Sequence, residues 1–220
     1  MSFNFLRLNF NGDPNLGLYG FANDNYCILG FEPHQSILNK IKEILGIDIL
    51  ITTIAGTELS GLFAVGNKNG IILPKITEEF EIKKLKEFEI NFKIINSKET
   101  ALGNLILCND KGCLISSSLK NYKKEIAETL DCEIEIGKIA NLNIVGSCAI
   151  ANNIGCLCHR DAKEEEMKII ENLLKVKVDV GSVNYGNPFI KSGIIVNSKG
   201  IIFSEQTTGS EIGRFEEVFK

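Results

Sequence analysis

The stretch Leu105-Ile-Leu-Cys108-Asn109-Asp-Lys-Gly112-Cys-Leu-Ile115 decides the fold, because the chain repeats it. Two apolar runs meet across a polar four-residue turn, a pattern that predicts a β-hairpin. We expect Gly112 to take the positive φ of a tight turn, and Asn109 and Asp110 to hydrogen-bond their own backbone. One such hairpin would be ordinary, so its repetition is the informative feature.

The turn recurs at a nearly constant interval along the whole chain. Its copies are Asn67-Lys-Asn-Gly70, Asn109-Asp-Lys-Gly112, Asn152-Asn-Ile-Gly155 and Asn197-Ser-Lys-Gly200, after a degenerate first copy, Asn23-Asp-Asn-Tyr26. Successive leading asparagines are 44, 42, 43 and 45 residues apart. Repeats of this length build propellers, solenoids or closed rings.

A second position repeats in phase with the asparagine. Six residues before it stand Gly17, Gly61, Gly103 and Gly146, and only the fifth copy departs, with Lys191 there and Gly193 two places on. Two registers that stay in phase across otherwise unrelated residues indicate five structural repeats rather than chance.

Each repeat predicts the same order of elements: a hairpin, a helix and a strand. The first hairpin strands are predicted at 16–22 and 59–65, and the closing strands at 47–53, 90–95, 132–136 and 176–180. Helical spacing is clearest where Leu119, Tyr122, Ile126 and Leu130 share one face. Predicted helix caps are Thr77, the pair Asp161 and Glu164, and the pair Thr208 and Glu211.

The fifth repeat ends one strand short, at a helix carrying Ile212, Phe215 and Phe219. A spare strand is predicted at the other end of the chain, over 3–10. An open array would leave two unpaired edges, which proteins avoid. We therefore predict an α/β fold in which 1–220 form a single domain, a closed ring of five pseudo-symmetric hairpin-helix-strand units whose N-terminal strand completes the C-terminal unit.

Composition narrows the functional class. The chain has 220 residues, 44% hydrophobic and 24% charged, with a net charge of −4 and a pI near 5.4, which argues against wrapping nucleic acid. Its apolar runs are shorter than the roughly 20 residues that span a bilayer, and its start lacks a secretory signal pattern. The seven cysteines lie mostly in apolar strand patterns, as free thiols of a reducing cytosol do. We expect a cytoplasmic protein with no DNA or membrane partner.

Candidate catalytic or metal-binding residues are few. The only histidines are His34, at a predicted helix start, and His159, in Cys156-Leu-Cys158-His159. In a strand the two cysteines share a face and the histidine points away, so we expect no metal and no cofactor. Rings of five such units also house guanidine-modifying enzymes with a cysteine nucleophile near the C-terminus, but no cysteine follows Cys158. The chain is predicted not to be an enzyme, with a deiminase-like enzyme as the open alternative.

Several stretches resemble one known family along the full length of the chain. They are Tyr19-Gly-Phe-Ala22, Thr53-Ile-Ala-Gly-Thr57, Val65-Gly-Asn-Lys-Asn-Gly70, Ala101-Leu-Gly-Asn104, Cys108-Asn-Asp110, Gly181-Ser-Val-Asn184, Tyr185-Gly186 and Thr207-Thr-Gly209. Together they resemble the translation initiation factor 6 family in its archaeal form, which lacks the C-terminal tail of the eukaryotic proteins. The resemblance implies a pentein-like ring of five α/β units.

The resemblance also implies a function. Members of the family bind the large (50S) ribosomal subunit on its intersubunit face and sterically prevent association with the small (30S) subunit. They dock on a ribosomal protein near the sarcin–ricin loop with minor rRNA contact, and in eukaryotes they accompany late subunit maturation. The resemblance therefore implies an anti-association factor, expected to be a monomer. A ring-shaped adaptor without a ribosomal role is the other alternative.

The resemblance further implies a docking surface at one mouth of the ring, around the residues that open the first strand of each unit. The ribosome-binding residues implied are Gly17, Gly61, Leu62, Lys68, Gly103 and Asn104. Glycine lets backbones approach closely, so the same glycines equally suit packing around the axis, the role assigned to Gly146. Leu62 stands where eukaryotic members carry a basic residue.

Overall fold

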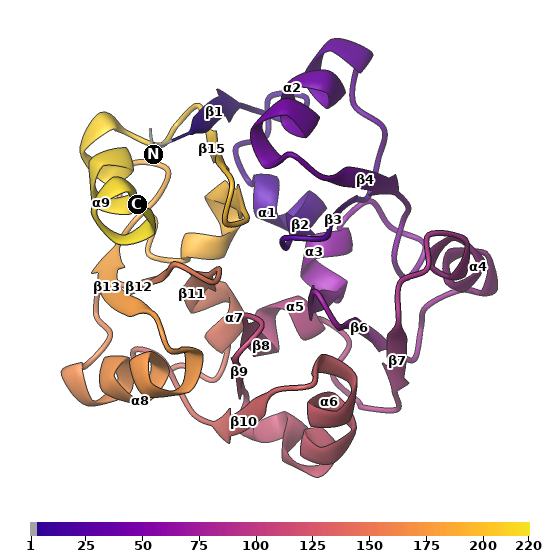
Figure 1. Cartoon of the computed structure of the whole chain (residues 1–220). Helices are drawn as coiled ribbons and strands as arrows, with labels where there is room; N and C mark the ends of the chain where they lie inside the picture. Colours follow the sequence, from indigo (N-terminus) through magenta and orange to yellow (C-terminus); the bar gives the residue numbers. More distant parts are fainter. Residues whose placement is uncertain (1–3) are drawn as a thin grey trace.

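Five small sheets stand around one central axis, each covered on the outside by a helix (Figure 1). This arrangement is seen in a computed structural model that describes residues 4–220. The first residue of the predicted strand 3–10 lies outside the described residues; the strand itself is β1 (Phe5–Leu8). The predicted α/β ring of five hairpin-helix-strand units is confirmed.

The five units repeat one order of elements. Unit 1 is α1 (Leu16–Tyr19), β2 (Gly20–Ala22), β3 (Tyr26–Leu29), α2 (Gln35–Leu45) and β4 (Asp48–Ile51). Unit 2 is α3 (Ser60–Phe63), β5 (Val65–Asn67), β6 (Gly70–Pro74), α4 (Glu79–Glu87) and β7 (Phe92–Ile95). Unit 3 is α5 (Leu102–Leu105), β8 (Ile106–Cys108), β9 (Gly112–Ile115), the 3-10 helix η1 (Ser117–Tyr122), α6 (Lys123–Leu130) and β10 (Glu133–Ile136).

The last two units follow the same order. Unit 4 is α7 (Val145–Cys148), β11 (Ala149–Ala151), β12 (Gly155–His159), α8 (Glu164–Leu174) and β13 (Lys177–Gly181). Unit 5 is the 3-10 helix η2 (Ile190–Gly193), β14 (Ile194–Val196), β15 (Ile201–Ser204) and α9 (Gly209–Phe219). Its outer strand comes from the other end of the chain, because β1 pairs in parallel with β15 from Phe5↔Ile201 to Leu8↔Ser204. That 1–220 fold as a single domain stays a prediction.

The first residues of each unit form one helical turn, and in units 1 and 2 a strand was predicted there, over 16–22 and 59–65. Backbone bonds from Leu18 N to Asn15 O (3.0 Å) and from Ala64 N to Ser60 O (3.0 Å) close two of these turns. A short buried apolar run does not distinguish a strand from a helical turn, which is why the prediction failed. Gly17, Gly61 and Gly103 therefore lie in α1, α3 and α5 and open no strand.

The glycines of these short helices let successive units touch around the axis. A Cβ added to Gly61 would lie 2.2 Å from Gly17 O, one on Gly103 2.1 Å from Gly61 O, and one on Gly146 2.3 Å from Gly103 O. No side chain fits at such distances. The glycines that repeat in the sequence are thus the positions at which the backbones of neighbouring units come into contact.

The turn glycines serve the same purpose at the other end of the sheets. A Cβ on Gly112 would lie 2.3 Å from the carbonyl oxygen of Leu173, in the outer helix of the next unit. Among the described residues, positive φ at glycine is confined to Gly12, Gly46, Gly56 and Gly186. The predicted positive φ at Gly112 is wrong: the position needs glycine because a neighbouring helix ends against it.

The apolar core is divided among the interfaces between units. Val65 and Ile72 of unit 2 pack with Leu119 and Ile126 of unit 3 in one buried cluster. Likewise Ile202 of unit 5 belongs to the cluster built mainly from unit 1. Each outer helix therefore covers its own sheet and the sheet before it, so the units depend on one another for burial.

Helix capping agrees with the sequence in one of three places. Glu211 N donates to Thr208 Oγ1 (3.4 Å) and Thr208 N to Glu211 Oε2 (2.7 Å), as predicted. Thr77 does not cap α4, because its hydroxyl donates to Pro74 O and Glu78 takes the N-cap position. At α8 the capping carboxylate is Glu166, which accepts from Lys163 N, two residues beyond the predicted pair.

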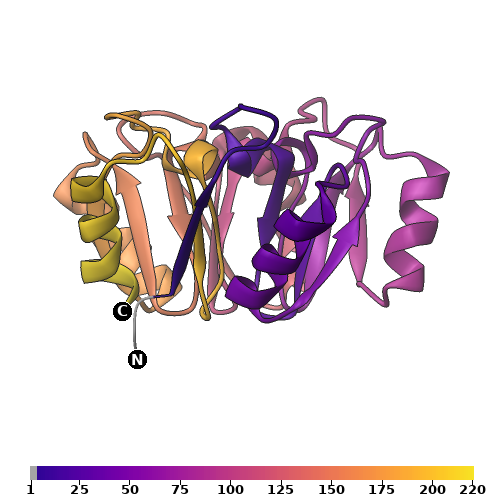
Figure 2. The ribbon, with the colours of Figure 1, turned by 90° about the horizontal axis from the view of Figure 1, so that it is seen from above.

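Seen from the side, the ring has two different ends (Figure 2). We call the end formed by α1, α3, α5, α7 and η2 the helix mouth. The end formed by the hairpin turns that start at Asn23, Asn67, Asn109, Asn152 and Asn197 is the asparagine mouth, and the C-terminus lies on this side. In residues 4–220 no helix is long and apolar enough to cross a membrane.

Candidate functional site

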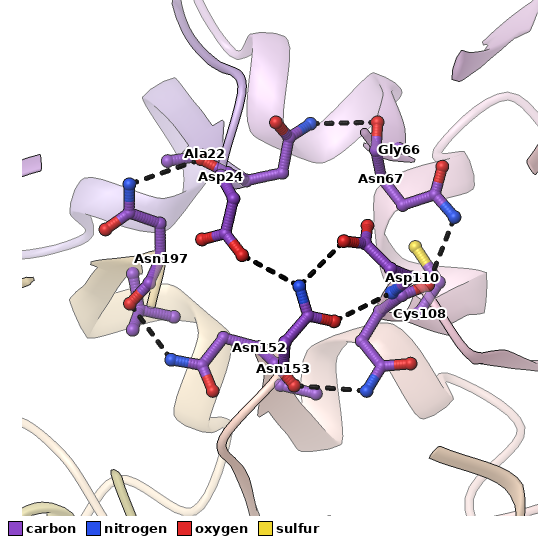
Figure 3. A pocket seen from close by; sticks show the side chains of 13 residues that line it. Ala22, Asp24, Gly66, Asn67, Cys108, Asp110, Asn152, Asn153 and Asn197 are labelled. Atoms are coloured by element: carbon purple, nitrogen blue, oxygen red, sulfur yellow. Dashed lines mark hydrogen bonds between the residues drawn. The ribbon is translucent and has the colours of Figure 1, made fainter. Parts of the chain in front are cut away.

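The asparagine mouth is closed by a relay of side chains (Figure 3). The Nδ2 atom of each leading asparagine donates to the backbone carbonyl of the next one: Asn23 to Asn67 (2.9 Å), Asn67 to Asn109 (3.1 Å), Asn109 to Asn152 (3.1 Å), Asn152 to Asn197 (2.9 Å) and Asn197 to Asn23 (3.3 Å). Five hydrogen bonds thus run once around the axis and return to their start.

One asparagine in this relay does three things. Asn109 Oδ1 accepts from Lys111 N (2.9 Å) and Gly112 N (3.0 Å), which shapes its own turn. Its Nδ2 reaches the next unit and also Leu174 O (2.9 Å) at the end of α8. Only an amide supplies two N–H donors and a separate acceptor oxygen from one short side chain, so aspartate or serine could shape the turn but could not make both donated bonds as well.

A second layer of polar groups fills the centre of this mouth. Asn153 Nδ2 lies 2.7 Å from both Asp24 Oδ2 and Asp110 Oδ2, and Ser198 donates to Asp24 through N and Oγ. The cavity between them measures about 20 Å³, room for about one water. These groups satisfy one another, so the asparagine mouth is a structural closure.

The helix mouth presents a different surface. One residue after each position of the glycine register, the five units present a ring of half-buried side chains that carries no charge. These residues are Leu18, Leu62, Asn104, Ser147 and Ser192. Beneath them Lys191 is 6% exposed, and its Nζ donates 2.7 Å across the ring to Gly103 O. Burial lowers the pKa of Lys191 to about 8.

A pocket of about 250 Å³ opens in the helix mouth. Its walls are Leu18, Asn104, Ile144, Ser147, Phe189, Lys191 and Ser192. Beside it the loop before η2 carries Phe189, 37% exposed, and Tyr185, 77% exposed. Aromatic side chains held out from a rigid frame are the residue type that dominates binding energy at protein interfaces.

Three buried or half-buried carboxylates hold the loops of the helix mouth in place. Glu81 accepts from Ala55 N and Gly56 N, both at 2.9 Å, and Glu166 accepts from Ala140 N at 2.8 Å. Glu211 accepts from Gly186 N at 2.8 Å and so fixes the loop that carries Tyr185. Burial raises the pKa of Glu166 and Glu211, but their hydrogen bonds lower it more, and both stay below the usual range. Of these three glutamates, only Glu211 was predicted from the sequence to cap its helix.

The predicted ribosome-binding residues do not all meet. Leu62 and Asn104 are half-exposed at the helix mouth, while Gly17, Gly61 and Gly103 are buried in its short helices. Lys68 lies at the asparagine mouth, because β5 carries the chain there from α3, and its Nζ is 3.8 Å from Asp110 Oδ2. The expectation that Lys68 shares one mouth with the glycines is therefore wrong.

In the part of the chain that the structure describes, no cysteine is hydrogen-bonded to a histidine, the pairing expected of a deiminase-like nucleophile and base. Burial raises the pKa of the Cys27 and Cys148 thiols to about 12, which suppresses the reactive thiolate. His159 Nδ1 accepts from Asp161 N (3.1 Å). Over residues 4–220 no three metal-binding side chains cluster, and all seven cysteines are free.

Comparison with known proteins gives one consistent family. Residues 5–218 match the model of the eIF-6 family. The chain is 40% identical over 214 residues to the protein named Translation initiation factor 6 of Methanocaldococcus jannaschii, covering 94% of each chain. Proteins of the same name from Staphylothermus marinus (41% identity; 95% of this chain and 94% of the relative) and Saccharolobus islandicus (40%; 97% and 98%) are similar to it over nearly their whole length.

Proposed function

The chain belongs to the eIF-6 family, and we propose from this premise that it is a translation initiation factor that binds the large (50S) ribosomal subunit and sterically prevents its association with the small (30S) subunit. The observation that carries the proposal is the match over residues 5–218, together with near-complete coverage of relatives named Translation initiation factor 6. A contribution to large-subunit biogenesis belongs to the same proposal.

The helix mouth is the face we assign to docking. Its central ring (Leu18, Leu62, Asn104, Ser147 and Ser192) is uncharged and half-exposed, and Tyr185 stands beside it at 77% exposure. The asparagine mouth, by contrast, uses its polar groups on one another. Of the residues implied by the family resemblance, Gly17, Gly61, Leu62, Gly103 and Asn104 belong to the proposed face, and Lys68 lies outside it.

The mechanism is steric, so it needs a body that keeps its shape. Closure by β1, the relay of asparagines and the carboxylates under the mouth loops all restrict motion between units. An uncharged ring on a chain of net charge −4 suits a ribosomal protein, near the sarcin–ricin loop, better than bare rRNA phosphate. We propose that the protein acts as a monomer in the cytoplasm, without catalysis or cofactor.

Asn104→Lys tests the proposed face. The variant puts a long cation at the centre of the ring, and interfaces concentrate their energy in a few central residues. We expect a loss of about 2 kcal/mol in binding to 50S subunits, some thirtyfold in Kd, with an unchanged melting temperature. Co-sedimentation with purified subunits and thermal unfolding are measured in parallel.

Asn25→Lys is the matched control, since Asn25 is exposed at the asparagine mouth. It should co-sediment with 50S subunits as the unchanged protein does. If Asn104→Lys binds normally, or if both variants lose binding equally, the helix mouth is not the docking face. If Asn104→Lys loses stability along with binding, Asn104 has a structural role.

A further inference from the structure

The geometry points to a carboxylate site in the pocket of the helix mouth: an acidic side chain of the docked protein enters it and pairs with Lys191. This inference rests on the proposed function, because the pocket lies in the proposed docking face. It adds the chemistry of the partner group and names Lys191 as the residue that selects it.

Lys191 is a buried cation with too few partners. Its ammonium carries three donors, yet within the described chain it has one hydrogen bond, to Gly103 O at 2.7 Å, and no carboxylate within salt-bridge distance. At 6% exposure water does little to replace the missing acceptors. A buried charge is costly unless it is paired, so the site favours an incoming anion.

Two further polar groups of the pocket also lack internal partners, whereas the Ser192 hydroxyl is hydrogen-bonded to Asn187 and Phe189. Over residues 4–220 the side-chain amide of Asn104 and the hydroxyl of Ser147 make no hydrogen bond, and no Asp or Glu is among the seven residues of the wall. Both groups can donate, as can the free N–H groups of Lys191. The pocket therefore offers hydrogen-bond donors and one positive charge, and no negative charge of its own.

The remaining walls select a small anion on an apolar stem. Leu18, Ile144 and Phe189 supply apolar surface, which excludes water and strengthens an ion pair inside. About 250 Å³ accommodates the carboxylate and methylenes of one glutamate or aspartate. A backbone phosphate of rRNA brings its sugars with it and is usually met by several cations, whereas this pocket holds one.

Butyrate is the probe, because it is a carboxylate on a short apolar stem. Titration of the ¹⁵N-labelled full chain should shift the amide resonances of Asn104 and Ser147 to saturation at millimolar butyrate. Butylammonium and butanol, of the same size, should shift them at least tenfold less. In Lys191→Met the butyrate response should weaken at least tenfold, with a thermal midpoint no lower than that of the unchanged protein.

Lys199→Met is the matched control. Lys199 also donates to a backbone carbonyl, Gly46 O at 2.8 Å, but at the asparagine mouth, so its loss should leave butyrate binding unchanged. Ser147→Asp covers the case that Lys191→Met fails to fold: its own carboxylate should occupy the pocket and abolish butyrate binding.

The docked state is tested with the same variants. Lys191→Met should bind 50S subunits about tenfold more weakly than Lys199→Met, and saturating butyrate should compete with docking of the unchanged protein. Equal binding of both variants, or butanol shifts as large as those of butyrate, overturns the inference. If inorganic phosphate binds more tightly than butyrate, the occupant is a phosphate of RNA and the inference is wrong. If the unchanged protein does not bind subunits at all yet responds to butyrate, the proposed function fails while the carboxylate site stands.

Discussion

Asn109→Ala should cost the protein a large part of its stability, because one buried side chain shapes its own turn and joins unit 3 to unit 4 at two points. Asn109 is 4% exposed and makes four hydrogen bonds: two accepted within its turn, one donated to Asn152 O and one to Leu174 O. At about 1 kcal/mol for each bond the loss is about 4 kcal/mol, with Leu174 O left unpaired at the end of α8. A domain of ordinary stability holds roughly 5–15 kcal/mol in all.

Urea unfolding followed by circular dichroism measures this loss. Asn109→Asp separates the two roles of the side chain, since it keeps the turn acceptors but turns a negative charge toward two carbonyl oxygens. We expect Asn109→Asp to be destabilised as well. Asn143→Ala, at an exposed asparagine, should stay within about 0.5 kcal/mol of the unchanged protein. A loss below about 1 kcal/mol for Asn109→Ala would refute the relay as a stabilising element.

Three further predictions concern the ring. Gly61→Ala should lower the free energy of unfolding by about 2 kcal/mol or more, because its Cβ would lie 2.2 Å from Gly17 O. Gly213→Ala, at a helical position of α9 where an added Cβ meets no atom, should raise the free energy of unfolding by up to about 1 kcal/mol. Urea titration compares the two variants. Deleting residues 1–10 removes β1 and exposes β15, so calorimetry should show a markedly lower melting temperature. Folding lowers the pKa of Lys191 from 10.5 to about 8, so between these pH values the unfolded chain holds a proton on Lys191 that the folded chain has lost. The free energy of unfolding should therefore rise with pH in this range, by up to about 1.4 kcal/mol per pH unit. An equally steep rise in Lys191→Met would contradict this prediction.

Repetition in the sequence predicted the architecture, because a closed ring can be inferred from the number and order of the repeats without knowing any individual contact. The spacing of the asparagines fixed the number of units, and the missing last strand located the closure between β1 and β15. Those inferences depend only on counting elements and pairing edges. They hold even though some individual elements were predicted wrongly, such as the helical turn α1, where a strand was expected.

The reasons behind the repeated residues were not accessible in the same way. Gly112 suggested a positive φ, but it is required because Leu173 O of the next unit lies where a Cβ would stand. The Asn109 amide suggested a turn, but it also reaches two carbonyls of the next unit. Both roles depend on contacts more than 40 residues away in the chain, and no local pattern encodes such contacts.

The candidate site was predictable only in part. The family resemblance implies that Leu62 and Asn104 lie together at one mouth of the ring, and both are half-exposed at the helix mouth. Lys68 does not share that mouth, because β5 runs away from α3 and ends in the turn at the opposite end of the ring. In the sequence, Lys191 is only an exception to the glycine register, and spacing along the chain does not predict that its Nζ reaches Gly103 O.

Subunit joining followed by light scattering tests the central claim most directly. Purified 30S and 50S subunits are mixed at a magnesium concentration that supports association, with increasing amounts of the protein. The account predicts that the scattering increase falls toward zero as the protein approaches equimolarity with 50S subunits, and that Asn104→Lys requires about thirtyfold more protein. Undiminished joining at saturating protein would contradict the account.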